Sequence, residues 1–428
     1  MGLGYVGLPL AMAFAQKFKT IGYDINGSII EQLKFGRSNI DDIPNFIIRK
    51  YLKKTFFPTS NENNLKGCDF YIICVPTPLG PNHKPDLTYI MDASQRIRRN
   101  IKKGAFVILE STTYPGTTEE VVGPIIEEGG LKAGIDFGLA FSPERIDPGN
   151  KKWRLDNTPK VIAGITPECT DICERLYSTV IKAKLIRVSN PRTAEAVKLV
   201  ENIFRGVNIA LVNELALIFE KMGIDTWEVI DAAATKPHSF MAHYPGPGVG
   251  GHCIPLDPFY MAYKAEQYGI IPRFITTAGL INEYMPTHVV NLLQNAMAIR
   301  GKRIRDSRIL LLGVAYKKNI SDVRGSPAIE IIKELRAAGA KVSYYDPYVP
   351  AIKLQHNNLK SQKIKSDFIK QADAVIITTN HDEFRKINSF PFKKDALIID
   401  CFNHLKNIKT KWPIICLGKP NNANLNYH

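Results

Sequence analysis

The sequence predicts an α/β fold in which two parallel sheets are joined by a long central helix and a helical middle region. Short apolar segments that end in polar loops alternate with helical patterns through the first 190 residues, as in a sheet with crossover helices. From Pro191 to Gly223 the helical periodicity is unbroken, and the alternation of strands and helices returns near Ser307. We therefore expect three domains, with boundaries at 1–190, 191–300 and 301–428.

The first residues, MGLGYVGLPLA, place Gly2, Gly4 and Gly7 in the G-x-G-x-x-G spacing of a dinucleotide-binding turn. A helical pattern follows, and KTIGYDI then predicts a short strand that ends in Asp24. A carboxylate about twenty residues after such a turn meets the ribose 2′-hydroxyl of NAD and repels a 2′-phosphate. The pattern predicts an NAD-binding, Rossmann-like first domain. The turn residues expected to contact NAD are Gly2, Gly4, Tyr5, Val6 and Gly7.

A dinucleotide-binding turn normally joins a buried strand to its helix, whereas only Met1 precedes Gly2. We therefore expect the first strand of the N-terminal sheet to be missing, through a misassigned start codon or a trimmed chain. On this interpretation an in-frame segment of about six apolar residues lies upstream. Its removal would expose strand edges and impair NAD binding.

Three further strands are predicted by CDFYIIC, GAFVILE and DFGLAF, and each runs into a polar loop. The carboxyl ends of parallel strands share one edge, where open α/β sheets bind ligands. The loop residues in question are Val75, Pro76 and Thr77, then Thr112, then Glu144 and Arg145. Loop hydroxyls are also common helix caps, so Thr112 alone does not decide the site.

The stretch HYPGPGVGGHCIPLDPFYM contains so many glycines and prolines between 245 and 251 that it excludes a helix or strand interior. Cys253 therefore ends a loop in which main-chain amides could stabilise an oxyanion, with His252 and Asp257 nearby. In a chain that binds NAD, this pattern indicates covalent aldehyde oxidation. Hydride transfer turns an alcohol into an aldehyde, the thiolate traps it, a second hydride leaves a thioester, and water releases an acid. Two NAD are used in turn.

In the central helix, Glu195, Lys198 and Asn202 recur at three- and four-residue steps and share one face. Such a stripe is usually solvated, but the apolar neighbours of Asn202 indicate partial burial. The length of the helix suits a domain connection and a dimer interface. In the last third, YKKNISDVRGSP lies between a strand and a helix start, so its cations Lys317, Lys318 and Arg324 predict an anion pocket.

The net charge of +15 does not by itself indicate a nucleic-acid partner, because the densest basic stretch, RIRRNIKKG, falls at an expected helix end. Seven scattered cysteines without C-x-x-C spacing predict reduced thiols and no metal site, as in a cytoplasmic enzyme. We find no secretory signal pattern and no uninterrupted apolar run near the ~18 residues of a membrane span. We expect no membrane or nucleic-acid partner.

Ordered motifs over nearly the whole chain resemble the UDP-sugar 6-dehydrogenases. They are GLGYVGLPLA, VPTPLGPNHKPD, ESTTYPGTT, SPERIDPG, AEAVKLVENIFRGVNIALVNE, GVGGHCIPLDP and GVAYKKNISDVRGSP. SPERIDPGN and YPGPGVGGHCIPLDPFY are most similar to the members that oxidise UDP-N-acetylglucosamine for surface polysaccharides. The resemblance implies an NAD-dependent homodimer or larger oligomer.

The resemblance also implies residue roles. Cys253 matches the nucleophile, and Asp257 the carboxylate that helps to deprotonate the thiol or activate water. Lys198 matches a lysine that stabilises alkoxide and oxyanion, and Asn202 an asparagine that contacts the substrate. Thr112 and Glu144 match groups that hold the hydrolytic water and the sugar. The remaining expected contacts with substrate or cofactor are Arg145, Tyr244, Gly250, Lys317 and Arg324.

Two departures from UDP-glucose dehydrogenases favour an N-acetylated sugar. Their second glutamate is replaced by Pro148 beside Asp147, and their cross-subunit arginine has no counterpart before the thiol. Lys236, His238 or His243 could substitute for that arginine.

Several alternatives stay open. The same reaction could use UDP-N-acetylmannosamine, UDP-N-acetylgalactosamine or UDP-glucose. A two-electron hydroxyacid dehydrogenase is disfavoured because it needs no thiol. A catalytically impaired UDP-sugar-binding protein is the alternative of another class.

Overall fold

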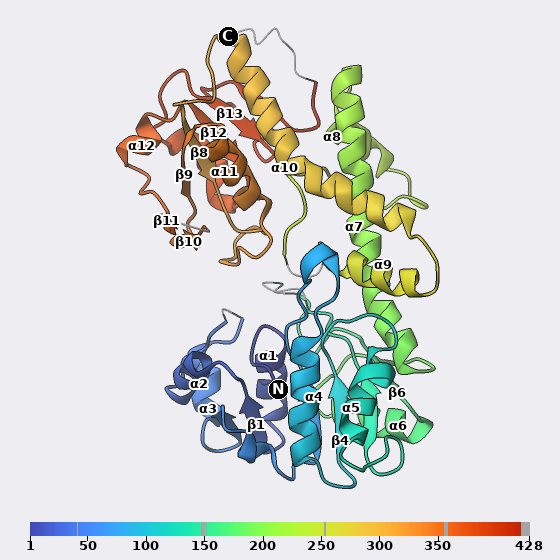
Figure 1. The fold of residues 1–428 in the computed structure, drawn as a ribbon. Helices are drawn as coiled ribbons and strands as arrows, with labels where there is room; N and C mark the ends of the chain where they lie inside the picture. The colour runs from blue at the N-terminus through green and yellow to red at the C-terminus, as the bar shows by residue number, and fades with distance from the viewer. Residues whose placement is uncertain (41, 147–149, 151, 252–253, 355–357, 421–428) are drawn as a thin grey trace. The chain divides into compact units, whose positions relative to one another are not determined.

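The computed structural model describes residues 1–40, 42–146, 150, 152–251, 254–354 and 358–420 (Figure 1). The chain forms two units. Unit 1 comprises Met1–Glu201 and Phe259–Ile271, and unit 2 comprises Asn202–Pro258 and Pro272–His428. The predicted division into three domains stays a prediction.

Unit 1 contains a five-stranded sheet and a separate parallel pair among its described residues. The sheet has the order β3 (Phe70–Ile73), β4 (Phe106–Leu109), β5 (Gly138–Phe141), β6 (Lys160–Gly164) and β7 (Leu185–Arg187). The pair is β1 (Thr20–Tyr23) and β2 (Phe56–Thr59), in register Thr20↔Phe56. The predicted strands after the glycine turn and before the three polar loops are thus confirmed.

The predicted α/β fold with parallel sheets is confirmed, and the unit 1 sheet has one antiparallel pair, β5 with β6. A parallel pair needs a crossover, usually a helix, to bring the chain back to the starting edge. The described part of the connection from 142 to 159 contains no helix. The chain therefore enters β6 from the edge at which β5 ends.

Helices cover both faces of the unit 1 sheet (Figure 1). One face packs on α4 (Thr88–Asn100) and α5 (Gly123–Glu127). The other packs on α1 (Gly7–Phe14) and α6 (Pro167–Ser178). The far side of α1 packs with α2 (Gly27–Lys34), α3 (Asn45–Tyr51) and β2. The glycine turn is therefore held between two apolar clusters.

The basic stretch at the end of α4 is paired with nearby carboxylates. Arg96 and Arg99 each bind Glu62 at 2.8 Å, and Arg98 binds Glu128. These three arginines thus form ion pairs that connect α4 to neighbouring segments of unit 1.

Unit 2 contains a parallel sheet of five strands among its described residues, as the sequence predicts. Its order is β14 (Ile414–Cys416), β13 (Leu397–Asp400), β12 (Ala374–Ile377), β8 (Arg308–Leu312) and β9 (Lys341–Tyr345). One face packs on α10 (Arg273–Ile299) and α11 (Pro327–Ala337). The other face is covered by residues of α12 (Asp367–Lys370) and of the following 3-10 helix (Asp382–Ser389). Unit 2 also contains α8 (Thr226–Ala233) and the antiparallel pair β10 (Ala351–Lys353) and β11 (Asn358–Lys360). The helix α9 (Asp257–Gln267) begins in unit 2 and continues in unit 1.

The central helix α7 (Pro191–Met222) is confirmed, and Gly223 ends it with a φ of +77°. By length and composition, α7 is also the one described helix that could cross a membrane, with a mean hydropathy of 1.3. The sequence was expected to contain no membrane-spanning segment, because it has no uninterrupted apolar run of that length. The mean hydropathy of α7 is high all the same, because an average over 18 residues tolerates isolated charged residues. A core helix passes the same test, so the finding is weak.

The start of α7 is anchored in unit 1 by the buried carboxylate of Glu195. This carboxylate accepts hydrogen bonds from the backbone N–H groups of Gly116 (2.5 Å) and Thr118 (2.9 Å), and from the Thr118 hydroxyl (2.7 Å). The anchor fixes the loop after β4 to the helix that carries Lys198.

Burial raises the pKa of Glu195 to about 7 from an ordinary value of 4.5. Between these values the folded chain holds a proton that the unfolded chain has lost, so stability falls as pH rises. We expect Glu195→Gln, which cannot ionise, to reduce the difference in unfolding free energy between pH 5 and pH 8 by about 2 to 3 kcal/mol. Denaturant titrations of both proteins at both pH values measure this. Equal pH dependence would contradict it.

Candidate active site

The glycine turn begins with a left-handed residue and is closed by backbone contacts. Gly2 has a φ of +85°, and a Cβ there would lie 2.4 Å from the carbonyl oxygen of Cys74. A Cβ on Gly7 would lie 1.8 Å from the carbonyl oxygen of Gly2. Both positions thus require glycine for the turn itself.

Gly4 is different, because a Cβ there would meet nothing within 4 Å. The fold therefore does not require glycine at this position. A glycine with open space in front of it at the start of a helix is suited to close approach by a ligand phosphate.

The carboxylate of Asp24 lies beside this turn. Its Oδ2 accepts a hydrogen bond from the Leu3 N–H and its Oδ1 one from the Asn26 N–H, each at 2.8 Å. The structure thus brings the predicted glycines and the predicted carboxylate together, in the arrangement that an adenosine ribose and pyrophosphate need. Tyr5 and Val6, both partly buried, occupy the turn between Gly4 and Gly7.

The loops after β3 and β4 are bound to each other. Ser111 donates its hydroxyl to the carbonyl oxygen of Val75 at 2.8 Å, and Thr77 is buried. The carbonyl of Thr77 accepts a hydrogen bond from the Tyr260 hydroxyl at 2.7 Å. Thr112 follows Ser111 and is half-buried, while Pro76 is exposed. The predicted cofactor loops therefore share one edge of the sheet.

Beneath that edge lies a buried charge cluster that the sequence did not reveal. The Lys160 ammonium binds the Glu110 carboxylate at 2.8 Å and the carbonyl oxygen of Pro143 at 3.1 Å. The Tyr177 hydroxyl donates to the other Glu110 oxygen. Burial raises the pKa of Glu110, and the charge of Lys160 opposes that rise. Lys160 thereby holds the loops after β4 and β5 together.

Glu144, next to Pro143, is buried and has an uncompensated oxygen. Its Oε1 accepts a hydrogen bond from the Ile146 N–H, whereas its buried Oε2 has no hydrogen-bond partner among the described residues. An orphaned buried carboxylate oxygen is costly unless a ligand or water binds it. The neighbouring Arg145 binds the carbonyl of Pro159 and the carboxylate of Glu201. The Arg145 guanidinium is thus held by protein partners, whereas the Glu144 carboxylate keeps one oxygen for a ligand.

Two catalytic candidates of unit 2 contact each other. Asn202 of α7 donates its side-chain amide to Oδ2 of Asp257, the first residue of α9, and both side chains are buried. Lys198 is one helical turn before Asn202 on α7, and its side chain is also buried.

Cys253 and its neighbour His252 lie outside the described residues, as do Asp147 and Pro148. The residues on either side of the thiol are described. Ile254 packs on α7, where a Cβ on Gly206 would lie 3.3 Å from its Cγ2 atom. Gly206 follows Asn202 by one turn of α7, so Ile254 packs one turn away from the Asn202–Asp257 pair.

On the other side of the thiol, the glycine loop packs on the loop after β8. Gly251 donates its N–H to the carbonyl of Arg324 at 2.9 Å, and a Cβ on Gly250 would lie 2.6 Å from Cβ of Tyr316. The structure thus brings Gly250 together with residues 316–327, which carry the predicted anion pocket and are called the anion loop below. The Arg324 guanidinium binds the Asp322 carboxylate at 2.7 to 3.0 Å and is partly exposed. Lys317, in the same loop, is half-buried.

A pair of asparagines fastens the glycine loop to two helices. Asn213 of α7 accepts a hydrogen bond from the Gly246 N–H and donates one to Asn282 of α10, each at 3.0 Å. Asn282 donates in turn to the carbonyl of Gly206 at 3.0 Å. Neither asparagine is among the residues predicted from the sequence.

The anion loop rests on a buried histidine–aspartate pair that was also missed. Asp346 accepts N–H groups from Val314 (2.7 Å) and Ala315 (3.2 Å), and its Oδ2 lies 3.2 Å from His381 Nε2. Burial would raise the pKa of Asp346, but the hydrogen bonds from His381 and Val314 hold it below its usual value. Because His381 Nδ1 accepts the Asn319 N–H, its Nε2 carries the proton.

Tyr244 is turned toward a different group of residues. Its hydroxyl donates to Asp231 at 2.8 Å, and its ring stacks on Trp227 at 5.3 Å. Lys236 and His238 are exposed, and the ring of His243 meets Phe204 edge-on.

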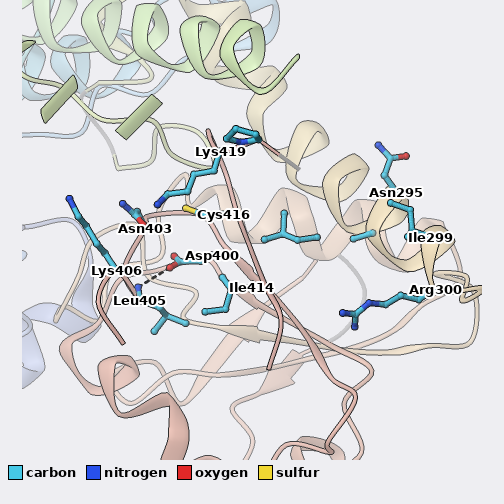
Figure 2. Close-up of a pocket in the computed structure, with 13 residues that line it drawn as sticks. Asn295, Ile299, Arg300, Asp400, Asn403, Leu405, Lys406, Ile414, Cys416 and Lys419 are labelled. Carbon is cyan, nitrogen blue, oxygen red and sulfur yellow. Dashed lines mark hydrogen bonds between the residues drawn. The ribbon is translucent and has the colours of Figure 1, made fainter. Parts of the chain in front are cut away.

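Figure 2 shows a further hollow of unit 2, of about 360 Å³, which none of the predicted site residues lines. Arg300 at the end of α10 lies on one side, and Asp400 accepts the Leu405 N–H on the other. Among the described residues, no group of three or more metal-ligating side chains is present.

Comparisons with known proteins cover most of the chain. Residues 1–181 match the NAD binding domain of the UDP-glucose/GDP-mannose dehydrogenase family, 192–284 its central domain, and 310–407 its UDP binding domain. The chain is 38% identical over 395 residues to a UDP-N-acetyl-D-glucosamine 6-dehydrogenase of Pseudomonas aeruginosa, with 92% of each chain covered. It is 37% identical over 416 residues to a UDP-N-acetyl-D-mannosamine dehydrogenase of Pyrococcus horikoshii, with 95% of each covered. The solved UDP-D-ManNAc dehydrogenase of P. horikoshii superimposes with a TM-score of 0.88 at 34% identity, covering 98% of both chains.

Gly4→Ala and Gly7→Ala form a matched pair. We expect Gly7→Ala to lower the unfolding free energy by at least about 2 kcal/mol, because its Cβ collides with the main chain. Gly4→Ala should change it by less than about 0.5 kcal/mol but weaken NAD binding at least about tenfold. Denaturant titration and NAD titration measure the two effects. Unchanged NAD affinity in Gly4→Ala would disprove the assignment of this turn.

Lys160→Met should lower the unfolding free energy by about 3 to 5 kcal/mol, because it leaves Glu110 buried without its cation. The double variant Lys160→Met/Glu110→Gln removes both charges and should recover most of that loss. Denaturant titrations of the two single variants and the double variant give the coupling between the side chains. A double variant as unstable as Lys160→Met would show that the charge pair is not the cause.

Proposed function

Because the chain belongs to the UDP-glucose/GDP-mannose dehydrogenase family, we propose that it oxidises the C6 hydroxyl of a UDP-N-acetylhexosamine to a carboxylate. It is an NAD-dependent UDP-sugar dehydrogenase. The observation that carries the proposal is that three successive regions of the chain match the NAD binding, central and UDP binding domains of this family in order. The position of Asp24 beside the glycine turn agrees with this match.

The substrate we propose is UDP-N-acetylglucosamine, as a precursor of surface polysaccharides. The 38% identical relative named for this substrate supports it, and the two departures from UDP-glucose dehydrogenases support an N-acetylated sugar. UDP-N-acetylmannosamine is the second candidate, because relatives named for it are of similar identity. The alternative of another class, a catalytically impaired UDP-sugar-binding protein, is not favoured by the similarity to dehydrogenases over most of the chain.

The residues beside the glycine turn fit NAD. The open space at Gly4 and the helix start at Gly7 suit the pyrophosphate, and Asp24 suits the adenosine ribose. NAD supplies a two-electron acceptor that takes a hydride from the sugar. We propose that Val75, Pro76, Thr77 and Thr112 line this site on the sheet edge and that Arg324 also binds the cofactor.

The thiol of Cys253 converts the oxidation into a four-electron reaction. After the first oxidation, the thiolate adds to the C6 aldehyde and forms a thiohemiacetal. Loss of a second hydride leaves a thioester, and hydrolysis releases the carboxylate and the free thiol. Each sugar thus consumes one water and reduces two NAD.

We propose that Lys198, Asn202 and Asp257 act on the charges of this sequence. The ammonium of Lys198, whose side chain is largely buried, stabilises the C6 alkoxide and the later oxyanions, since a positive charge is most effective where water is excluded. The Asn202 amide holds the Asp257 carboxylate and contacts the substrate oxygen. Asp257 serves as the base for the thiol or the hydrolytic water.

The orphaned oxygen of Glu144 supports its proposed role with the hydrolytic water and the sugar, together with Thr112. We place the UDP-sugar against Arg145, Gly250 and Lys317. The hydrogen bond of Tyr244 to Asp231 must break or be shared if Tyr244 contacts the substrate.

We further propose a cytoplasmic homodimer or larger oligomer, with the predicted domains 1–190, 191–300 and 301–428 serving NAD binding, catalysis with dimer contact, and UDP binding. The central helix α7 supports the dimer contact, because Val200, Leu211 and Ile218 on it are about half-exposed, at 57%, 50% and 46%.

Product stoichiometry tests the proposal. We expect two NADH per UDP-N-acetylglucosamine, measured by absorbance, and a uronic acid product, measured by mass spectrometry. The kcat/KM for UDP-N-acetylglucosamine should exceed those for UDP-N-acetylmannosamine, UDP-N-acetylgalactosamine and UDP-glucose. NADP should be a poor substitute, because Asp24 repels its 2′-phosphate.

Cys253→Ser should lower the rate of acid formation at least about 100-fold, whereas the matched control Cys68→Ser should keep it. One NADH per sugar would contradict the four-electron reaction. Binding of the UDP-sugar without any NADH would favour the impaired binding protein.

A further inference from the structure

Residues 313–319, called the lysine segment below, lead from β8 into the anion loop and carry Lys317 and Lys318. The segment begins at Gly313 with a φ of +88°, a conformation that other residues rarely adopt. A Cβ on Gly313 would lie 2.3 Å from Cβ of Thr379, so the chain turns close against the residues that follow β12. The position of both lysines therefore depends on what holds this segment at the carboxyl edge of the sheet.

Asp346, the first residue after β9, holds the start of the lysine segment. Its Oδ2 atom accepts the N–H groups of Val314 at 2.7 Å and Ala315 at 3.2 Å. Its Oδ1 atom accepts those of Tyr348 at 2.8 Å and Val349 at 3.1 Å. Hydrogen bonds to a carboxylate are stronger than those between neutral groups. This buried side chain thus joins the chain after β8 to the chain after β9.

His381 holds the other end of the lysine segment and is fully buried. Its Nδ1 atom accepts the Asn319 N–H at 2.8 Å, and its Nε2 atom lies 3.2 Å from Oδ2 of Asp346. The side chain of Asn319 also exchanges hydrogen bonds with Asp382, at 2.6 and 3.2 Å. Through Asp346, one imidazole therefore connects the two ends of the segment that carries the lysines.

The second half of the anion loop has different partners. The carbonyl of Arg324 accepts the Gly251 N–H at 2.9 Å, and its guanidinium binds Asp322. None of these bonds involves His381. Loss of the His381 bonds should therefore release the lysine segment and leave the half with Arg324 in place.

We propose that His381 and Asp346 are positioning residues for the UDP-sugar and that they act through Lys317. The contact of Lys317 with the UDP-sugar rests on the proposed function, and the diphosphate supplies the negative charge that a lysine binds. Ordering a backbone segment and a long side chain on binding reduces affinity. A segment that is fixed before the ligand arrives leaves only the side chain to be ordered. Because His381 is fully buried, it acts on the ligand only through the segment that it holds.

The test uses His381→Phe, which keeps a ring against Tyr348 and Phe384 but removes both nitrogen atoms. We expect the Kd for UDP, measured by calorimetry, to rise at least about tenfold. The KM for the preferred UDP-sugar should rise in parallel, whereas kcat and the KM for NAD should change less than about twofold. A general loss of structure would change all of these quantities together.

Asp346→Asn is the second variant, since it keeps the shape of the side chain but removes the charge. It should raise the Kd for UDP at least about threefold. The matched control is Ile369→Val, which removes one buried methyl group from α12, next to the amino end of β12. The control should leave the Kd for UDP unchanged.

A double-mutant cycle shows whether His381 acts through Lys317. Lys317→Ala alone should also weaken UDP binding at least about tenfold. In the Lys317→Ala background, His381→Phe should add less than about twofold, because the contact that it positions is already gone. A full additional loss in that background would overturn the proposal.

Amide hydrogen exchange tests the geometry without a ligand. The N–H groups of Val314 and Asn319 should exchange at least about tenfold faster in His381→Phe, whereas that of Gly251 should not change. Unchanged exchange, or an unchanged Kd for UDP in His381→Phe, would overturn the proposal. Failure of the proposed function is a separate result, because the unmodified chain would then not bind UDP at all.

Discussion

The buried ammonium of Lys160 is the interaction on which the ligand edge of unit 1 depends, because it binds two loops at once. Its partner Glu110 is the first residue after β4, and Pro143 precedes Glu144, so one charge fixes the spacing of both loops. The cost of burying a lysine is offset only while the carboxylate and the carbonyl stay in place. The loops that carry Thr112 and Glu144 are thus set by electrostatics below the surface.

Unit 2 uses networks of polar side chains for the same purpose. Asn213 and Asn282 connect the glycine loop to α7 and α10, and His381 with Asp346 supports the loop after β8. Each of these buried groups has partners, and a satisfied buried network defines one geometry. A glycine-rich loop would otherwise have many conformations, so its precision comes from neighbours outside the motif.

The sequence was informative where the chemistry is local. Three glycines, a helix and Asp24 follow one another in the chain, and the long periodicity of α7 needs no partner to be recognised. The supporting residues were missed because their partners are distant: Glu110 and Lys160 are separated by 50 residues, and Asp346 and His381 by 35. Spacing carries no signal for such pairs. The antiparallel direction of β6 was not predicted, because pairing direction depends on the connection, and the described part of residues 142–159 has no helix.

The helix α9 has a consequence for how the chain is made. Asp257 belongs to unit 2, whereas Phe259–Ile271 belongs to unit 1, where Tyr260 and Lys264 bind Thr77 and Glu120. A ribosome therefore releases most of unit 1 long before its last segment exists. Unit 1 must wait, incomplete, while more than fifty residues of unit 2 emerge. Domains usually fold as continuous units from the N-terminus. In this chain the order of synthesis and the order of assembly cannot coincide.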